Sequence, residues 1–155
     1  MILGSQVGGD EQYDLYLRDK DSIRPLIVDR SKRVESVEWG PNSEWFLFTS
    51  NLRNKTDMDL YRWDINKNSQ ELLLALEGNH TISDISLNGK WVLLTRFRSV
   101  TDSDVLLIDL ETKKLVNITE HTGQMASRGG LFAKDSKGFF FISDKDTDIS
   151  QVRFA

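Results

Sequence analysis

Three aspartates near the end of the chain have a spacing typical of a calcium-binding loop. Asp144, Asp146 and Asp148 form the pattern D-x-D-x-D, in which carboxylates two residues apart can converge on one hard cation. A complete loop of this type also has glycine at its sixth position and glutamate at its twelfth, where this chain has Ile149 and Ala155. The three aspartates are therefore a weak calcium candidate, and a solvated hairpin turn rich in aspartate is the simpler interpretation.

Four further side chains are candidates for contacts with a ligand or a partner protein. Arg96 and Arg98 flank a phenylalanine at the end of an expected strand, where they could bind a carboxylate. Trp39 and Trp63 offer aromatic surfaces on which a sugar or a peptide could stack. The alternative interpretation is that the arginines lie on a solvated hairpin and that the tryptophans belong to the core or to its rim.

The sequence offers no recognisable set of catalytic residues. It contains no cysteine, and none of its serines lies in a G-x-S-x-G nucleophile motif. Its two histidines, His80 and His121, are expected in surface turns between repeats, where they would make local hydrogen bonds. Two histidines without cysteine or a third ligand do not predict a metal site. We therefore assign no catalytic residue and no cofactor.

The composition predicts a folded protein that binds neither nucleic acid nor a membrane. The chain has 155 residues, of which 39% are hydrophobic and 28% charged, and its formal net charge is −4. A chain with this balance has no basic surface for nucleic acid. The sequence shows no aliphatic run of membrane-spanning length and no signal peptide. We expect a cytoplasmic protein, with the periplasm left open because the native N-terminus could be missing.

Four stretches of the chain read alike, at intervals of about 45 residues. They are DLYLRD, DLYRWD, DVLLID and SQVRFA, which begin at Asp14, Asp59, Asp104 and Ser150. A second landmark repeats in step, at Trp45, Trp91 and Phe139. Repeats of this length, made of short strands and turns, are typical of a β-propeller in which each repeat forms one four-stranded blade. We expect Trp45 and Trp91 to occupy equivalent buried positions.

The fold class predicted from these repeats is all-β, namely a partial β-propeller. Runs such as WFLF and WVLL are apolar on both faces, as expected for strands covered on both sides by neighbouring blades. Two complete four-stranded blades are expected at 34–77 and 80–120, with an incomplete blade on either side. The chain is then a single propeller fragment with blades at about 1–33, 34–79, 80–124 and 125–155. The first blade lacks its innermost strand, and the last ends with its third strand.

Several segments resemble the repeats of a known protein family. The turns GPNSEW, LNGKW and KDSKGF are similar to the S-P-D-G-K-W turn of TolB-type propellers, a repeat that also builds the propeller of the prolyl oligopeptidase family of serine peptidases. Three longer stretches resemble the peptidase propellers, especially those of the acylaminoacyl-peptidase-like branch. They are GGDEQYDLYLRD (Gly8–Asp19), NKTDMDLYRWD (Asn54–Asp64) and the run from Ile118 to Ile142.

The resemblance implies a division of labour between two domains. Catalysis would belong to an α/β-hydrolase domain with a Ser-Asp-His triad, and the propeller would gate and orient the peptide substrate. The implied partners are therefore a peptide and the hydrolase domain of the parent protein.

Other functions stay open at this point. A TolB-type or WD-repeat propeller would act as a scaffold for a protein partner, and the open blade edges could also allow self-association. A glycosidase or lyase propeller would need carboxylates on its innermost strands, where the sequence has Glu35, Glu38 and Asp84.

Overall fold

The computed structural model describes residues 1–5, 13–29, 31–147 and 149–155, which form antiparallel sheets. Within these ranges there is no helix, and therefore none that could cross a membrane. Part of the Gly8–Asp19 stretch lies outside the described residues, as does Gln6, which was expected to end the first strand. The all-β prediction is confirmed.

The strands form four sheets, which we call blades 1 to 4. Blade 1 contains β1 (Ile2–Ser5), β2 (Asp14–Arg18) and β3 (Ile23–Ile27). Blade 2 contains β4 (Val34–Trp39), β5 (Trp45–Ser50), β6 (Asp59–Asp64) and β7 (Ser69–Leu74). Blade 3 contains β8 (Asn79–Ile85), β9 (Trp91–Ser99), β10 (Asp102–Asp109) and β11 (Leu115–Asn117). Blade 4 contains β12 (Ser127–Phe132), β13 (Phe139–Ser143) and β14 (Gln151–Phe154).

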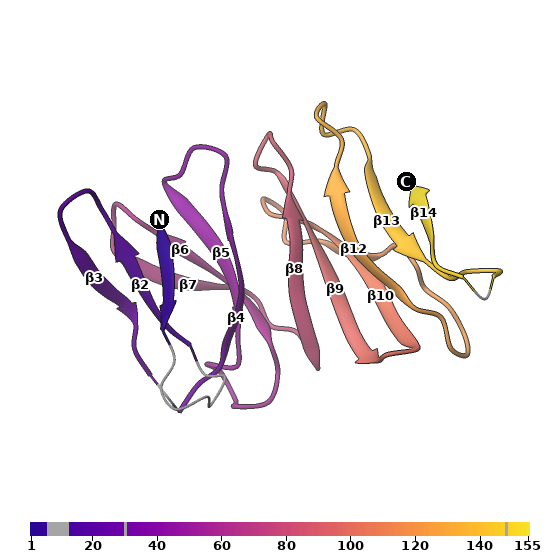
Figure 1. Ribbon diagram of the computed structural model, residues 1–155, viewed down its shortest axis with the longest axis horizontal. Helices are drawn as coiled ribbons and strands as arrows, with labels where there is room; N and C mark the ends of the chain where they lie inside the picture. Colours follow the sequence, from indigo (N-terminus) through magenta and orange to yellow (C-terminus); the bar gives the residue numbers. More distant parts are fainter. Residues whose placement is uncertain (6–12, 30, 148) are drawn as a thin grey trace.

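The blades stand side by side in chain order, from blade 1 on the left of Figure 1 to blade 4 on the right. In each complete blade the strands follow one another across the sheet, so β4 and β8 are the first strands of blades 2 and 3 and lie at one edge. We call this position the inner strand, and β12 holds it in blade 4. This arrangement confirms the predicted partial β-propeller with two complete and two incomplete blades.

Three apolar clusters hold neighbouring blades together. They pack blade 1 on blade 2, blade 2 on blade 3 and blade 3 on blade 4. The middle strands contribute to both of their faces, and all six residues of β5 are buried. Burial on both faces explains why these strands are continuously apolar instead of alternating. The fully buried aliphatic and aromatic side chains include Phe46, Leu47, Phe48, Leu60, Val92, Leu93 and Leu94.

Backbone hydrogen bonds that close the turn between the first and second strands show which residues are equivalent in blades 2, 3 and 4. They show that the position expected for the aromatic landmark of blade 4 was wrong. Gly40 N–H donates to Trp45 O at 2.9 Å, and Ser86 N–H donates to Trp91 O at the same distance. In blade 4 the matching bond ends at Gly138 O, 2.8 Å from Ala133 N. Gly138, and not Phe139, therefore occupies the tryptophan position.

The second landmark shifts by one residue in the opposite direction. Asp59 pairs with Ser50 in blade 2, and the corresponding pair in blade 4 is Gln151 with Ser143. The fourth repeat thus begins at Gln151 and not at Ser150. Gly138 and Gln151 each lie 47 residues after their counterparts in blade 3, Trp91 and Asp104, so the two landmarks keep one common interval.

Trp45 and Trp91 share a register position but differ in burial. Trp45 pairs with Asp64, and Trp91 pairs with Asp109, so each opens the second strand of its blade. Trp45 is buried, with 8% of its surface exposed, and its ring lies against Gly40. Trp91 is half-buried. The expectation of equivalent positions is correct, and the expectation of equal burial is wrong.

Blade 4 exposes an apolar face on the side away from blade 3. Phe139 and Phe141 pack toward blade 3, so by strand alternation Phe140 and Ile142 point the other way. Both are exposed, as are Val152 and Phe154, which pair with them across the sheet. In blades 2 and 3 the corresponding face is covered by the next blade. Self-association through this face stays a prediction.

Candidate functional site

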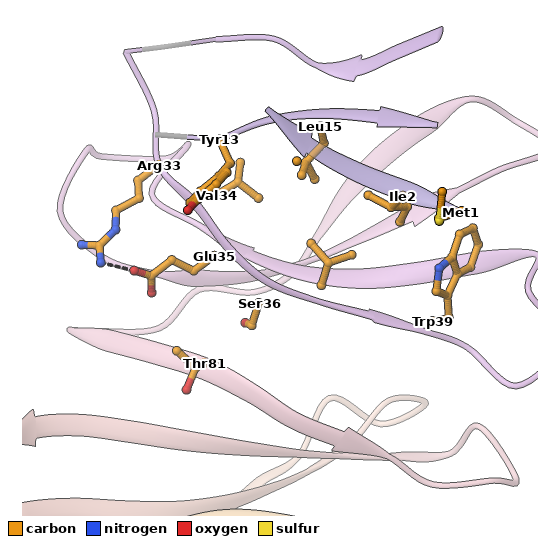
Figure 2. A pocket seen from close by; sticks show the side chains of 12 residues that line it. Met1, Ile2, Tyr13, Leu15, Arg33, Val34, Glu35, Ser36, Trp39 and Thr81 are labelled. Carbon is orange, nitrogen blue, oxygen red and sulfur yellow. Dashed lines mark hydrogen bonds and ion pairs between the residues drawn. The ribbon is translucent and has the colours of Figure 1, made fainter. Parts of the chain in front are cut away.

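A groove of about 780 Å³ lies between blade 1 and the inner strand of blade 2. One wall is β1, represented by Ile2 and Gly4, and the facing wall is β4, represented by Val37 and Trp39. Leu15 of β2 and Thr81 of β8 also line the groove, and they lie on opposite sides of β4 in the view of Figure 2. Because β1 corresponds to the second strand of a complete blade, the groove lies where blades 2 and 3 hold their inner strands.

The ends of this groove differ in chemical character. Arg33 and Glu35 form an ion pair at one end, drawn as a dashed line in Figure 2. Trp39 lies toward the other end, and its ring packs edge-on against Phe46 with the centroids 5.6 Å apart. Tyr13, 43% exposed, lies over Gly4. The groove therefore offers charge, aromatic surface and a strand edge along one path.

A second hollow of about 690 Å³ continues along the inner strands toward blade 4. It shares Glu35 and Thr81 with the first groove, and Arg128 of β12 lies on its far side. Phe97 lines it and is 41% exposed, while the buried Oδ1 of Asn79 has no hydrogen-bond partner within the described structure. The inner strands β4, β8 and β12 thus line a continuous polar and aromatic surface, which we call the axial face.

Side chains of earlier blades bind backbone N–H groups of the next inner strand. Ile82 N–H donates to Ser36 Oγ at 2.9 Å, which links blade 3 to blade 2. Phe132 N–H donates to Asp84 Oδ2 at 2.7 Å, and Gly129 N–H donates to Thr95 Oγ1 at 3.0 Å, which link blade 4 to blade 3. Each bond satisfies an N–H that the strand's own sheet leaves unpaired, so the inner strands are held in fixed positions.

The three inner-strand carboxylates are engaged separately. Asp84 accepts hydrogen bonds from the N–H groups of Phe132 and Ile85, and Glu35 pairs with Arg33. Burial raises the pKa of the Glu38 carboxyl, and the neighbouring Asp84 carboxylate raises it further. Among the described residues no group of three His, Asp or Glu side chains could hold a metal ion. Asp84 is therefore a structural carboxylate, whereas Glu38 is exposed and interacts with it through charge.

Arg96 and Arg98 both bind a buried carboxylate. Arginines on a solvated hairpin would instead point into water. Asp104 is 1% exposed, and its Oδ2 accepts bonds from Arg96 Nε at 3.0 Å and from Arg98 Nη1 at 2.6 Å. Burial alone would raise the pKa of Asp104, but the bonds from Arg98 and Arg96 outweigh it and hold that pKa below its usual value. A role of these arginines in ligand contacts stays a prediction.

His80 is buried in a strand, which corrects its expected position in a surface turn, whereas His121 is half-buried in the connection between β11 and β12. His80 lies in β8 with 2% of its surface exposed, and burial lowers its pKa. The His121 side chain is 8% exposed, and its Nδ1 lies 2.8 Å from Thr119 O and 3.1 Å from Asp104 Oδ1. Its Nε2 lies 3.2 Å from Asp102 Oδ1. His121 therefore belongs to the same ion-pair cluster as Arg98.

The calcium candidate is only partly described. Asp144 Oδ1 accepts a hydrogen bond from Ala126 N–H at 2.8 Å, which fixes it to blade 4. Asp146 lies in a turn with a φ of 63°. Asp148 lies outside the described residues. The D-x-D-x-D site stays a weak candidate.

The two candidate tryptophans lie in different environments. Trp39 lies in the groove, as its proposed contact role requires. Trp63 is 6% exposed and stacks on Phe46 in the core between blades 1 and 2, with ring planes 10° apart. Trp63 therefore lies in the core, as the alternative interpretation of the sequence expected.

Solved structures with this arrangement include several propellers. TolB from Acinetobacter baumannii matches with a TM-score of 0.74 and 21% identity, over 99% of this chain and 37% of that one. The chain therefore has the fold of part of a β-propeller, as found in TolB. An oligogalacturonate lyase in complex with manganese matches with a TM-score of 0.70 and 14% identity, over 94% of this chain and 41% of that one. Puromycin hydrolase matches with a TM-score of 0.63 and 12% identity, over 86% of this chain and 21% of that one.

These propellers are longer than the chain, which spans less than two thirds of each of the three. No protein-family model and no curated protein matches the sequence. At identities of 21% and below, the structural similarity establishes the fold and leaves the activity to be inferred from the site.

Sequence reasoning did not find the groove as a site. The signal was present, because the first repeat lacks its innermost strand and a missing strand leaves a strand-wide space beside its neighbour. The buried Asp104 cluster was also missed. Its signal was the recurrence of aspartate at Asp14, Asp59 and Asp104, and all three are at most 3% exposed in the structure.

Proposed function

We propose that this chain is the non-catalytic propeller portion of a serine peptidase of the prolyl oligopeptidase family. In this proposal the propeller gates and orients peptide substrates for an α/β-hydrolase domain. The observation that carries it is the axial face, where two adjacent hollows present a strand edge, hydroxyl groups, aromatic rings and charged side chains. Such a surface suits an extended peptide, whose backbone needs hydrogen-bonding partners along its length.

The chemistry of the chain is consistent with binding and orientation. Nucleophilic catalysis requires a hydroxyl or thiol activated by a base, with donors placed for the oxyanion. The sequence has no cysteine and no G-x-S-x-G motif, His80 is buried, and His121 is held in the ion-pair cluster around Asp104. Bond cleavage is therefore assigned to the hydrolase domain. The fold shared with puromycin hydrolase supports a parent of the hydrolase class.

A second candidate function is favoured by a different observation. The apolar face of blade 4, formed by Phe140, Ile142, Val152 and Phe154, is exposed. A scaffold of the TolB or WD-repeat type would cover such a face with a partner protein. The similarity to TolB supports this alternative.

Comparison of the native protein with the isolated chain separates the two functions. The native protein should carry a G-x-S-x-G serine that reacts with a fluorophosphonate probe, and chain 1–155 should show no labelling and no turnover of acetyl-alanyl or alanyl-prolyl chromogenic substrates. Intact-mass analysis of the labelled native protein identifies the serine. A native protein without a hydrolase domain would contradict the peptidase proposal and favour the scaffold. Labelling of chain 1–155 at a single serine would contradict both.

A further inference from the structure

The turn between β8 and β9 contains the dipeptide Asn88-Gly89, whose chemistry the proposed function does not use. Asparagine is a chemically labile residue, because the backbone nitrogen of the residue that follows can attack its side-chain amide carbon. Glycine favours this attack, since it has no Cβ beside the nitrogen. Asn88 is exposed to water, which is the second reactant.

Two hydrogen bonds hold the amide oxygen of Asn88. Its Oδ1 accepts a bond from Ser86 Oγ at 2.7 Å and another from Lys90 N–H at 3.0 Å. The second bond closes a ring of atoms that contains both Asn88 Cγ and Gly89 N, so it folds the side chain toward the nitrogen that would attack it. Two donors on Oδ1 also stabilise the negative charge that this oxygen carries after the attack, as the donors of an oxyanion hole do.

The Ser86 hydroxyl is itself fixed in position. Ser86 is 0% exposed, and its Oγ accepts a bond from Trp91 N–H at 2.9 Å. Asn88 Oδ1 is the nearer of its two acceptors, because Trp91 O lies at 3.2 Å. Gly89 N–H donates to Ser86 O at 2.8 Å, and this bond is lost when hydroxide removes the proton. The donor to Oδ1 therefore stays in place during the attack.

The equivalent turn of blade 2 contains an asparagine in a weaker arrangement. Asn42 corresponds to Asn88, since each lies three residues before the tryptophan that opens the second strand. Its Oδ1 accepts a bond from Glu44 N–H at 3.3 Å, and the residue that follows is Ser43, whose Cβ obstructs the attack. Asn42 is exposed as well, so it is a matched control within the same chain.

The equivalent turn of blade 4 shows that an aspartate fits at this position. Asp135 lies three residues before Gly138, and its Oδ1 accepts a bond from Lys137 N–H at 3.0 Å, as Asn88 Oδ1 does in its own turn. The fold therefore accepts aspartate in place of Asn88, provided that the length of the backbone is unchanged.

We propose that Asn88 is a site of spontaneous deamidation, assisted by the two donors on its amide oxygen. Hydroxide takes the proton of Gly89 N, and this nitrogen forms a bond to Asn88 Cγ. The bond from Cγ to Nδ2 breaks, and Nδ2 takes up a proton from water and leaves as ammonia. Water then opens the cyclic imide. Cleavage of the new bond gives aspartate, and cleavage of the original peptide bond gives isoaspartate.

The two products have different structural consequences. Aspartate keeps the turn, as Asp135 does in blade 4. Isoaspartate adds one carbon to the backbone between Ser86 and Trp91, whose mutual hydrogen bonds close the turn. It therefore weakens the junction of β8 and β9. This modification is independent of the proposed function, because it needs only the atoms of one turn and water.

The test follows deamidation of the full chain at mildly alkaline pH by peptide mass spectrometry. We expect Asn88 to convert at least about tenfold faster than Asn42, because it has the additional donor and no Cβ beside the attacking nitrogen. Conversion of Asn88 in the folded chain should be at least as fast as in the same chain unfolded in urea. A protective turn would instead make the folded chain slower.

Two variants separate assistance from restraint. Ser86→Ala removes one donor to Oδ1 and should slow the conversion of Asn88 at least about threefold. If the hydroxyl only restrained the side chain, this variant would convert faster. Gly89→Ser places a Cβ beside the nitrogen and should also slow conversion at least about threefold. Serine fits there, because Ser43 and Ser136 have φ values of 58° and 57° at the equivalent positions.

Urea titration checks the fold of each variant and the effect of each product. Asn88→Asp should unfold at the same urea concentration as the unmodified chain, whereas the isoaspartate fraction of an aged sample should unfold earlier.

Any of four results would overturn the proposal. They are equal rates at Asn42 and Asn88, slower conversion of Asn88 in the folded chain than in urea, faster conversion in Ser86→Ala, and an unchanged rate in Gly89→Ser. If Ser86→Ala does not fold, the other three comparisons still decide. None of these results bears on whether a hydrolase domain is attached, so the two proposals fail separately.

Discussion

Arg53 binds the buried carboxylate of Asp59 through two hydrogen bonds, Nε to Oδ2 at 2.8 Å and Nη2 to Oδ1 at 3.0 Å. Asp59 is 0% exposed, and its Oδ1 also accepts a bond from Leu76 N–H at 2.8 Å. In blade 3 the equivalent carboxylate, Asp104, is bound by arginines of β9 instead. The buried aspartate is thus common to blades 2 and 3, and the chain supplies its cation from a different segment in each of the two.

Replacement of Asp59 by alanine should destabilise the protein strongly. The variant leaves the Leu76 N–H without an acceptor and Arg53 without its main partner, and losing one member of a buried pair costs about 3–5 kcal/mol. The measurement is the free energy of unfolding from urea titration. Lys67→Ala is the matched control, because it breaks an exposed pair with Asp64 and should cost less than about 1 kcal/mol. If both substitutions lowered the unfolding free energy equally, the burial of Asp59 would not contribute to stability.

The two register-equivalent tryptophans should respond unequally to truncation. Trp45 is buried, and Arg62 lies 4.7 Å above its ring, so Trp45→Ala should cost about 3–5 kcal/mol. Trp91 is half-buried, so Trp91→Ala should cost clearly less, about 1–3 kcal/mol. Calorimetric melting of both variants under identical conditions gives the comparison. A larger loss for Trp91 would contradict the difference in packing.

Gly40 should not tolerate a methyl group, because the Trp45 ring occupies the space. A Cβ at this position would lie 2.4 Å from Trp45 Cε2. We expect Gly40→Ala to lower the unfolding free energy by about 1–3 kcal/mol, the usual cost of overpacking. The double variant Gly40→Ala/Trp45→Leu should be less destabilised than the sum of the two single variants, since the smaller side chain relieves the clash. Strict additivity in this double-mutant cycle would rule out the contact as the cause.

His80 should make stability depend on pH below neutrality. Burial lowers its pKa in the folded protein from the ordinary value of 6.5, so below that pH the unfolded chain binds a proton that the folded chain does not. The unfolding free energy should therefore be unaffected by His80 above pH 6.5 and should fall below it, by at most about 1.4 kcal/mol per pH unit.

Denaturant titrations at pH 7.5, 6.5 and 5.5 measure this dependence. His80→Gln should have a shallower slope than the unmodified protein in the lower interval. Both proteins keep His121, so the difference in slope reports His80. Aspartates with lowered pKa, such as Asp57 and Asp109, contribute below their ordinary value of 3.8 and stay outside this window. Parallel slopes would contradict the assignment.

The repeat pattern predicted the architecture because it records the geometry of each blade. DLYRWD forms the third strand β6 and DVLLID ends the third strand β10, and their 45-residue interval is one blade. The same pattern was one residue off at both landmarks of blade 4, where the equivalent positions are Gly138 and Gln151. Sequence similarity alone placed Phe139 at the position of Trp45 and Trp91, because phenylalanine resembles tryptophan more than Gly138 does. In the structure the ring of Phe154 lies over Gly138 in place of the tryptophan.

The environment of polar residues was harder to predict than the strands. His80 was expected in a surface turn, and the burial of Asp59 and Asp104 was not predicted, because charged residues are mostly exposed. Each is buried because its partners come from segments that sequence spacing does not connect, such as Arg53 for Asp59 and His121 for Asp104. The groove was not predicted as a site either: the missing inner strand of the first repeat was visible in the sequence, but the facing wall belongs to the next blade.

The bonds from earlier blades to the inner strands of later ones all run in one direction, with the acceptor on the earlier blade and the donor on the later one. A ribosome releases the chain in that same order, so Ser36 emerges before Ile82, and Asp84 emerges before Phe132. The acceptor side chains therefore leave the ribosome before the N–H groups that they bind. Assembly from the N-terminal side does not have to wait for a later blade to supply these acceptors.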